Sequence, residues 1–269
     1  MSRNVDKFSF PFWVAHRGGG NLAPENTMQA FEMGYKRGFR AFECDARITK
    51  DGAAVVAHDD DLARTGGIDA QIADLTLKQL QSYDLNCSSS EFHGCFAPTV
   101  EQVCAFCLER GCALNLEIKP ALGLEEKTAK AAADAALPFA QKGLPILFSS
   151  FSEESLHWLE RNRPQTQRAL LKAFCVDEEA LLESLAGVGA FAANLYCEDL
   201  TESLVQQLHG DGYEVYAWTP ETLDEAVKMA SMGVDGVITD AVSEVGEKFL
   251  SDERAAASPL NPIASPAQA

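Results

Sequence analysis

Short runs of β-branched and aromatic residues alternate with amphipathic stretches along most of the chain, and this alternation constrains the fold more than any other feature. It is typical of α/β proteins, in which helices connect the strands of a parallel sheet. Nine segments have the composition of strands: residues 12–16, 41–48, 53–58, 113–119, 145–149, 168–172, 191–195, 214–219 and 236–239. The spacing of apolar residues predicts helices over residues 27–37, 125–136, 153–161, 178–185, 201–210 and 223–232.

The second and third predicted strands are too close together for a crossover helix. Only the four residues TKDG separate residues 41–48 from residues 53–58, and an Asp-Gly pair between two apolar runs is a hairpin signal. We therefore predict that residues 53–58 run antiparallel to residues 41–48. If the Asp-Gly pair forms a two-residue turn, Asp45 lies opposite His58 in this hairpin.

Without the antiparallel strand, eight strands alternate with helices, as expected of an α/β fold that closes into a (β/α)₈ TIM barrel. An open doubly wound sheet has the same alternation and is the alternative. We predict one barrel domain over residues 1–250, with a β-hairpin extension and an insertion over about residues 59–112. Residues 251–269 contain spaced prolines and no apolar period, which predicts a disordered tail.

The charge of the chain excludes several classes of partner. Its 40 acidic and 22 basic residues give a formal net charge of −18, which argues against nucleic-acid binding and against stable association with anionic membranes. No stretch has the apolar length of a membrane span or the apolar core of a signal peptide, so we expect a cytoplasmic protein. No heptad or long apolar run indicates an interface, which leaves the oligomeric state open.

The eight cysteines are too sparse for a disulfide scaffold, and we expect mainly reduced thiols. Cys104 and Cys107 form a CxxC, but it lies within a stretch of helical apolar spacing and has no second CxxC. We therefore interpret both as buried apolar side chains and not as metal ligands or a redox pair.

Polar side chains recur where the barrel strands end, which is where reactive groups gather in such barrels. Because side chains alternate along a strand, Glu43 and Asp45 share one face, and so do Glu117 and Lys119. The hairpin adds His58 to the same region. The residues gathered at these strand ends are His16, Arg17, Glu43, Asp45, His58, Glu117, Lys119 and Trp218.

Three carboxylates that converge from adjacent strands repel one another unless they are neutralised, and their oxygens are the ligands that hard cations prefer. We predict that Glu43, Asp45 and Glu117 bind one divalent cation, with Mg²⁺ favoured over Ca²⁺ because we expect a cytoplasmic protein. The cation, Arg17 and Lys119 would supply the local positive field that the acidic chain otherwise lacks.

This set of groups is suited to the cleavage of a phosphodiester. One histidine of His16 and His58 can accept the proton of the nucleophile while the other protonates the leaving alkoxide. The cation, Arg17 and Lys119 can stabilise the charge on the phosphoryl oxygens.

Six motifs in this order resemble the glycerophosphodiester phosphodiesterase family, most closely its cytoplasmic bacterial members. They are VAHRGGGNLAPENTMQAF, FECDARITKDGAAVVAHDDDLARTGG, LNLEIKP, FSSF, YAWT and GVDGVITDA, and the similarity runs from about Trp13 to about Gly246. The resemblance implies a TIM barrel that hydrolyses small glycerophosphodiesters, such as glycerophosphocholine or glycerophosphoethanolamine, to sn-glycerol 3-phosphate and an alcohol.

The resemblance also implies roles for single residues. His16 and His58 match the acid/base pair of the family, Arg17 matches its phosphate-binding arginine, and Lys119 lies near the phosphate. The implied metal ligands are Glu43, Asp45 and Glu117. Glu25 and Trp218 are further candidates for substrate binding, although the segment around Glu25 is also a helix start with Asn26 or Thr27 as its cap. The YAWT strand continues into Pro220-Glu221, where related sequences often have Val-Asn.

Some alternatives stay open. Similarity to phosphatidylinositol-specific phospholipases C suggests that the glycerol 2-hydroxyl attacks to give a cyclic phosphate, and direct attack by water is the competing route. A barrel of the same fold acting on lysophospholipids or another lipid-derived diester is a second hypothesis, and a non-catalytic binding barrel is a third.

Overall fold

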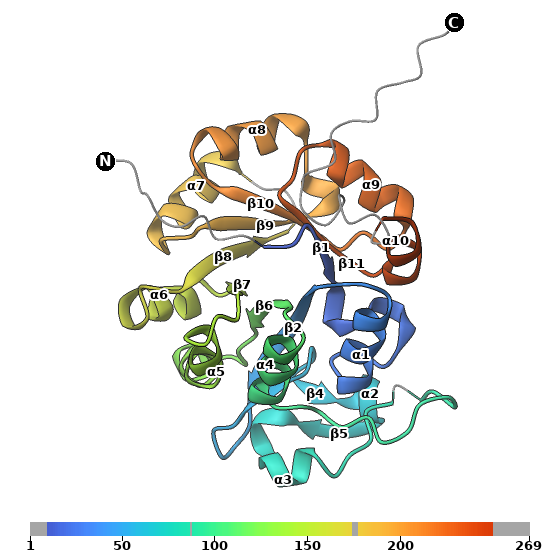
Figure 1. Cartoon of the computed structure of the whole chain (residues 1–269). Helices are drawn as coiled ribbons and strands as arrows, with labels where there is room; N and C mark the ends of the chain where they lie inside the picture. Colours follow the sequence, from blue (N-terminus) through green and yellow to red (C-terminus); the bar gives the residue numbers. More distant parts are fainter. Residues whose placement is uncertain (1–9, 87, 174–176, 250–269) are drawn as a thin grey trace, which may run out of the picture.

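The computed structural model describes residues 10–86, 88–173 and 177–249 (Figure 1). Eight parallel strands form a closed barrel, because β1 pairs with β11 on one side and with β2 on the other, through Ala15 and Phe42. The predicted (β/α)₈ barrel is therefore confirmed, and an open doubly wound sheet is excluded. The strands are β1 (Trp13–Ala15), β2 (Ala41–Ile48), β6 (Ala113–Ile118), β7 (Ile146–Ser150), β8 (Gln167–Lys172), β9 (Ala192–Tyr196), β10 (Glu214–Trp218) and β11 (Gly236–Thr239).

Helices surround the barrel (Figure 1). Several begin at a Ser, Thr or Asp whose side chain accepts a hydrogen bond from a backbone N–H of the first turn, which typically stabilises a helix by about 1 kcal/mol. The helices are α1 (Met28–Lys36), α4 (Val100–Glu109), α5 (Glu125–Ala140), α6 (Glu153–Asn162), α7 (Glu178–Gly187), α8 (Glu202–Gly210), α9 (Leu223–Ser231) and α10 (Val242–Phe249). Short 3₁₀ helices are η1 (His16–Gly18), η2 (Gly20–Leu22), η3 (Ile72–Asp74) and η4 (Cys197–Asp199).

The interior of the barrel is apolar toward the N-terminal ends of the strands and polar toward their C-terminal ends. Ala41 on β2 and Ala113 on β6 pack with Val14 and Ile238 in one buried cluster. Along β2, Glu43 and Asp45 follow Ala41 at alternate positions and are also buried. The strand period of two therefore directs these acids into the barrel, above its apolar floor.

The hairpin extension is present, but its register differs from the prediction. Strand β3 (Ala54–Val56) is antiparallel to β2, and it pairs Ala46 with Val56. Asp45 therefore lies opposite Ala57, whose N–H donates to the Asp45 carbonyl over 2.9 Å, so the predicted pairing of Asp45 with His58 was wrong. The reason is the turn: Thr49 N–H donates to the Ala53 carbonyl, which leaves three residues in the loop instead of two.

The chain after β3 builds a small layer beside the barrel, at the bottom of Figure 1. Its elements are β4 (Asp61–Leu62), α2 (Ala63–Gly66), β5 (Ile68–Gln71) and α3 (Leu77–Leu80). Leu62, Ile72, Leu80 and Leu85 form a separate hydrophobic core for this segment with Val55 of β3. The layer is thereby anchored to the hairpin that leads from β2 to the site.

The CxxC lies within α4, where Cys104 and Cys107 are fully buried in the core and unpaired, as predicted. Burial raises the pKa of Cys104 to about 12, so its thiol is protonated at neutral pH. The predicted C-terminal tail lies outside the described residues. In the described part of the chain, no helix combines the length and apolarity needed to cross a membrane.

Candidate functional site

A cavity of about 330 Å³ opens at the C-terminal end of the barrel. It contains eight of the nine predicted site residues, and Glu25 is the exception. A larger groove, of about 750 Å³, runs between α1 and the segment before α4 and contains none of the nine. The cavity is lined by His16, Arg17, Glu43, Asp45, His58, Asn115, Glu117, Lys119, Ser149, Phe151, Leu171, Trp218, Thr219 and Ile238.

Glu43, Asp45 and Glu117 form a buried acidic cluster in this cavity. The register of β2 and β6 places Asp45 beside Glu117, and one carboxylate oxygen from each of the three residues lies within 4.8 Å of the others. Burial and the neighbouring charge of Asp45 raise the pKa of Glu117 to about 7, and the same causes raise that of Glu43 well above its ordinary range. Glu117 Oε1 has no hydrogen-bond partner among the described residues. Three buried carboxylates in need of positive charge fit a hard divalent cation.

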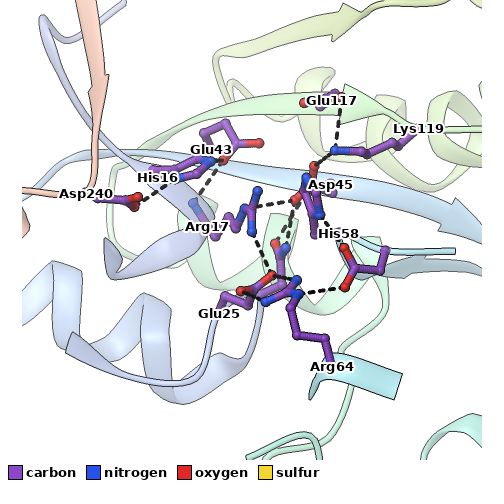
Figure 2. Close-up of polar contacts among 12 residues, drawn as sticks. His16, Arg17, Glu25, Glu43, Asp45, His58, Arg64, Glu117, Lys119 and Asp240 are labelled. Atoms are coloured by element: carbon purple, nitrogen blue, oxygen red, sulfur yellow. Dashed lines mark hydrogen bonds and ion pairs between the residues drawn. The ribbon is translucent and has the colours of Figure 1, made fainter. Parts of the chain in front are cut away.

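Asp45 differs from the two glutamates because cations surround it (Figure 2). Lys119 Nζ lies 3.4 Å from its Oδ1, and Arg17 Nε lies 3.8 Å from its Oδ2. Asn26 Nδ2 donates to Oδ2 over 2.7 Å. Although burial opposes ionisation, the positive charge of Lys119, that of His58 in its protonated form, and that of Arg17 hold the pKa of Asp45 below its ordinary range. Asp45 is therefore the ionised member of the cluster.

His16 is paired with a carboxylate that the sequence analysis did not identify. Its Nδ1 lies 2.7 Å from Oδ1 of Asp240, the residue that follows β11. On the other side of the ring, Nε2 lies 3.8 Å from Oε2 of Glu43. Because an ionised carboxylate only accepts, this pair places the imidazole proton on Nδ1 and leaves Nε2 to face the cluster.

His58 has a similar arrangement. Its Nδ1 lies 2.6 Å from Oδ1 of Asp59, and Arg47 Nε donates to its backbone carbonyl over 2.9 Å. Arg47 also donates to the carbonyl of Lys119 over 3.2 Å, so one buried guanidinium holds two site residues through their main chains. Burial lowers the pKa of His58, and this effect outweighs the attraction of Asp45. His58 is therefore mostly neutral at pH 7.

The HRGGG segment bends sharply after β1. Arg17 has a left-handed φ of 47°, and its backbone N–H donates to Glu43 Oε2 over 2.9 Å. A Cβ placed on Gly19 would lie 2.8 Å from the carbonyl oxygen of Ala30, so a glycine is needed where the loop meets α1. The bend turns the Arg17 side chain into the cavity, where its Nε has no hydrogen-bond partner among the described residues.

Glu25, a predicted substrate-binding residue, lies between two arginines (Figure 2). Arg17 Nη1 donates to it over 2.9 Å, and Arg64 donates to both of its oxygens over 2.6 and 2.8 Å. Thr27 caps α1, as one of the two predicted caps, while Asn26 binds Asp45.

Trp218 lies at the end of β10 and forms an aromatic wall of the cavity. The Phe151 ring meets it edge-on at a centroid distance of 5.4 Å, and the Tyr196 ring lies 5.3 Å away. Trp218 Nε1 donates to the Asn194 carbonyl over 3.1 Å, which fixes the indole in place.

Sequence reasoning did not identify Asp59, Arg64 or Asp240, and it identified Asn26 only as a candidate helix cap and not as a partner of Asp45. Asp240 had a usable signal, because it directly follows a predicted strand at the end of the barrel that carries the other site residues. Arg64 had no such signal, since its place depends on how the segment after β3 folds.

Comparison with known proteins identifies relatives that match most of the chain. The model of the glycerophosphoryl diester phosphodiesterase family matches residues 16–244. A glycerophosphodiester phosphodiesterase of Bacillus altitudinis is 29% identical over 84% of this chain and 93% of its own. Another, from Caldanaerobacter subterraneus subsp. tengcongensis, is 30% identical over the same shares.

A solved structure with the same fold is a phosphodiesterase of Oleispira antarctica in complex with the product sn-glycerol-3-phosphate. It is 29% identical, with a TM-score of 0.83 over 88% of this chain and 96% of that one. The family model spans both histidines, the acidic cluster and Asp240, and the relatives match across nearly their full lengths. The chain therefore belongs to the glycerophosphoryl diester phosphodiesterase family.

Proposed function

We propose that the protein hydrolyses small glycerophosphodiesters, such as glycerophosphocholine and glycerophosphoethanolamine, to sn-glycerol 3-phosphate and an alcohol. The observation that carries this proposal is one cavity that combines two carboxylate-paired histidines with a buried acidic cluster, Arg17 and Lys119. The product complex of the Oleispira antarctica relative supports the same chemistry.

Glu43, Asp45 and Glu117 would hold one divalent cation, which would act as a Lewis acid toward the phosphoryl oxygens. The all-oxygen donor set and the open cavity beside it suit Mg²⁺, which retains several of its waters, and we favour Mg²⁺ over Ca²⁺. Lys119 and Arg17 already compensate part of the negative charge of this cluster.

His16 and His58 would transfer the protons. Each has its Nδ1 occupied by a carboxylate, so Nε2 is the nitrogen that exchanges a proton with substrate. One ring accepts the proton of the attacking hydroxyl, and the other donates a proton to the departing alkoxide. The low pKa of His58 keeps one of the two rings neutral at physiological pH.

Arg17 and Lys119 would bind the phosphoryl oxygens. Arg17 Nε lines the cavity without a hydrogen-bond partner among the described residues, so it is available to a phosphoryl oxygen. A guanidinium and an ammonium at this place would stabilise the negative charge on the phosphoryl oxygens during displacement. The aromatic wall of Trp218 and Phe151 would contact the less polar part of the substrate.

The test is to incubate the purified protein with glycerophosphocholine, with and without a chelator, and to assay sn-glycerol 3-phosphate. We expect release that depends on added Mg²⁺. The proposal is wrong if no glycerophosphodiester yields product in the presence of Mg²⁺, Ca²⁺ or Mn²⁺.

A further inference from the structure

We propose that Arg64 is a positioning residue, which fixes the orientation of His58 and Arg17 from outside the cavity. It lies on α2, in the layer that follows the hairpin, and it does not line the cavity. The inference rests on the proposed function in assigning His58 and Arg17 their roles, but the contacts themselves are independent of it.

Arg64 donates to two carboxylates, and each of these carboxylates contacts a site residue. Its Nε donates to Oδ2 of Asp59 over 2.7 Å, and the other oxygen of Asp59 lies 2.6 Å from Nδ1 of His58. Its two terminal nitrogens donate to the two oxygens of Glu25, and Oε1 of Glu25 also accepts from Arg17. Figure 2 shows this guanidinium between Glu25 and the carboxylate that contacts His58.

The geometry of the guanidinium explains why an arginine is needed. Three of its N–H groups are directed to two carboxylates at once, which a lysine ammonium cannot reproduce in one plane. Burial alone would raise the pKa of Asp59, but hydrogen bonds from Arg64 and His58 lower it to about 2. Burial also opposes the ionisation of Glu25, but Arg64 and Arg17 lower its pKa. Both carboxylates are therefore ionised at neutral pH, and each keeps a fixed acceptor toward the site.

The layer after β3 gives Arg64 its position. Leu62, directly before α2, is buried in the core of this layer, and the side chain of Arg64 remains 48% exposed. An isolated ion pair at such exposure contributes little to stability. The contact of Arg64 with Glu25 is bidentate, and Arg64 also connects two segments that carry site residues. We therefore expect loss of Arg64 to affect turnover more than stability.

The first experiment is Arg64→Met, which removes the guanidinium and keeps a long, unbranched side chain. We expect kcat for glycerophosphocholine to fall about 10- to 100-fold, because small displacements of a proton-transfer group cost rates of this order. The melting temperature should change no more than in Arg161→Met, which removes a similarly exposed arginine paired with Glu126 on the outer helices.

Chemical rescue separates positioning from a general structural role. In Arg64→Ala, millimolar guanidinium should restore part of kcat, because the site is half exposed and the planar cation can bind both carboxylates. Methylammonium has the same charge but no planar set of N–H donors, and it should restore much less of kcat. The kcat of Arg64→Lys should lie between those of the wild type and Arg64→Met.

A readout without turnover keeps the inference testable if the wild-type protein proves inactive on every diester. Nitrogen NMR of the His58 ring should show Nδ1 protonated in the wild type and a mixture of tautomers in Arg64→Met. A wild-type His58 spectrum in Arg64→Met, or a kcat within about twofold of wild type, would overturn the role of Arg64. Absence of any diesterase activity in the wild type would instead contradict the proposed function.

Discussion

His16 and Asp240 are 224 residues apart in the chain, yet Nδ1 of one lies 2.7 Å from Oδ1 of the other. They meet because β1 and β11 are neighbours in the closed barrel, with Ala15 paired with Thr239. Each residue directly follows its strand, so barrel closure alone brings the imidazole and the carboxylate together.

Replacing this carboxylate, as Asp240→Asn, should lower kcat for glycerophosphocholine at least about tenfold. An amide can donate to Nδ1 and so favours the tautomer with the proton on Nε2, which no longer accepts a proton from substrate. The matched control is Asp235→Asn, because Asp235 lies 2.7 Å from Nε2 of His209 outside the cavity. Steady-state kinetics of the two variants measure this difference. Equal kcat values for Asp240→Asn and Asp235→Asn would show that Asp240 does not orient His16 for catalysis.

Substitution of either proposed proton-transfer residue should be severe. His16→Ala and His58→Ala should each lower kcat by about 10²-fold or more, with a smaller effect on KM. His209→Ala, an exposed histidine that also pairs with an aspartate, should retain wild-type turnover. If one cavity variant kept near wild-type kcat, its histidine would not transfer a proton in the rate-limiting step.

Removal of one carboxylate from the acidic cluster should weaken cation binding. Glu43→Gln keeps the size of the side chain and removes the carboxylate that would ionise on binding the cation, and we expect at least about tenfold weaker binding of Mg²⁺ by calorimetry. Glu109→Gln, in an exposed position at the end of α4, is the control. Unchanged affinity in Glu43→Gln would mean that the ligand set is wrong.

The raised pKa of Glu117 makes the stability of the cation-free protein depend on pH. Between its ordinary value of 4.5 and its folded value of about 7, the native state holds a proton that the unfolded chain has released. The free energy of unfolding therefore falls as pH rises through this window, by about 1.4 kcal/mol per pH unit, and this loss is complete above about pH 7.

Glu117→Gln removes this titration, so it should gain stability over the wild type as pH rises from about 5 to about 7.5 in chelator. Urea denaturation at several pH values measures the difference, in which groups with lowered pKa, such as Asp59 and Glu25, largely cancel. If the free energy of unfolding had the same pH dependence in both proteins, the pKa of Glu117 would not be raised in the native state.

The aromatic wall should affect binding more than chemistry. Trp218→Leu removes ring contacts with Phe151 and Tyr196, and we expect KM for glycerophosphocholine to rise about three- to tenfold with kcat within about threefold. Trp158→Leu, on α6 and away from the cavity, is the control. A large fall in kcat alone would assign Trp218 to the chemical step.

Local patterns were sufficient to predict the barrel and most of its site. Strand alternation placed Glu43 and Asp45 on one face, and the TIM-barrel rule placed them near His16 and Glu117, as the structure has them. These predictions depend on periods of two residues and on the ends of strands, which short segments encode.

Relationships that depend on turn geometry or on distant segments could not be predicted. The predicted register of the hairpin was wrong by one residue, because an Asp-Gly pair occurs in three-residue loops as well as in two-residue loops. Arg64 reaches Glu25 only because the layer after β3 has its own core, and nothing in the local sequence fixes where that layer packs.

Closure of the barrel through β1 also has a consequence for biosynthesis. The first strand emerges from the ribosome early, but one of its two edges stays unpaired until β11 has been made. Until then, His16 lacks the carboxylate that orients it. Under the proposed function, a nascent or truncated chain that stops before β11 cannot turn over substrate efficiently, and the appearance of activity marks the moment at which the ring of strands closes.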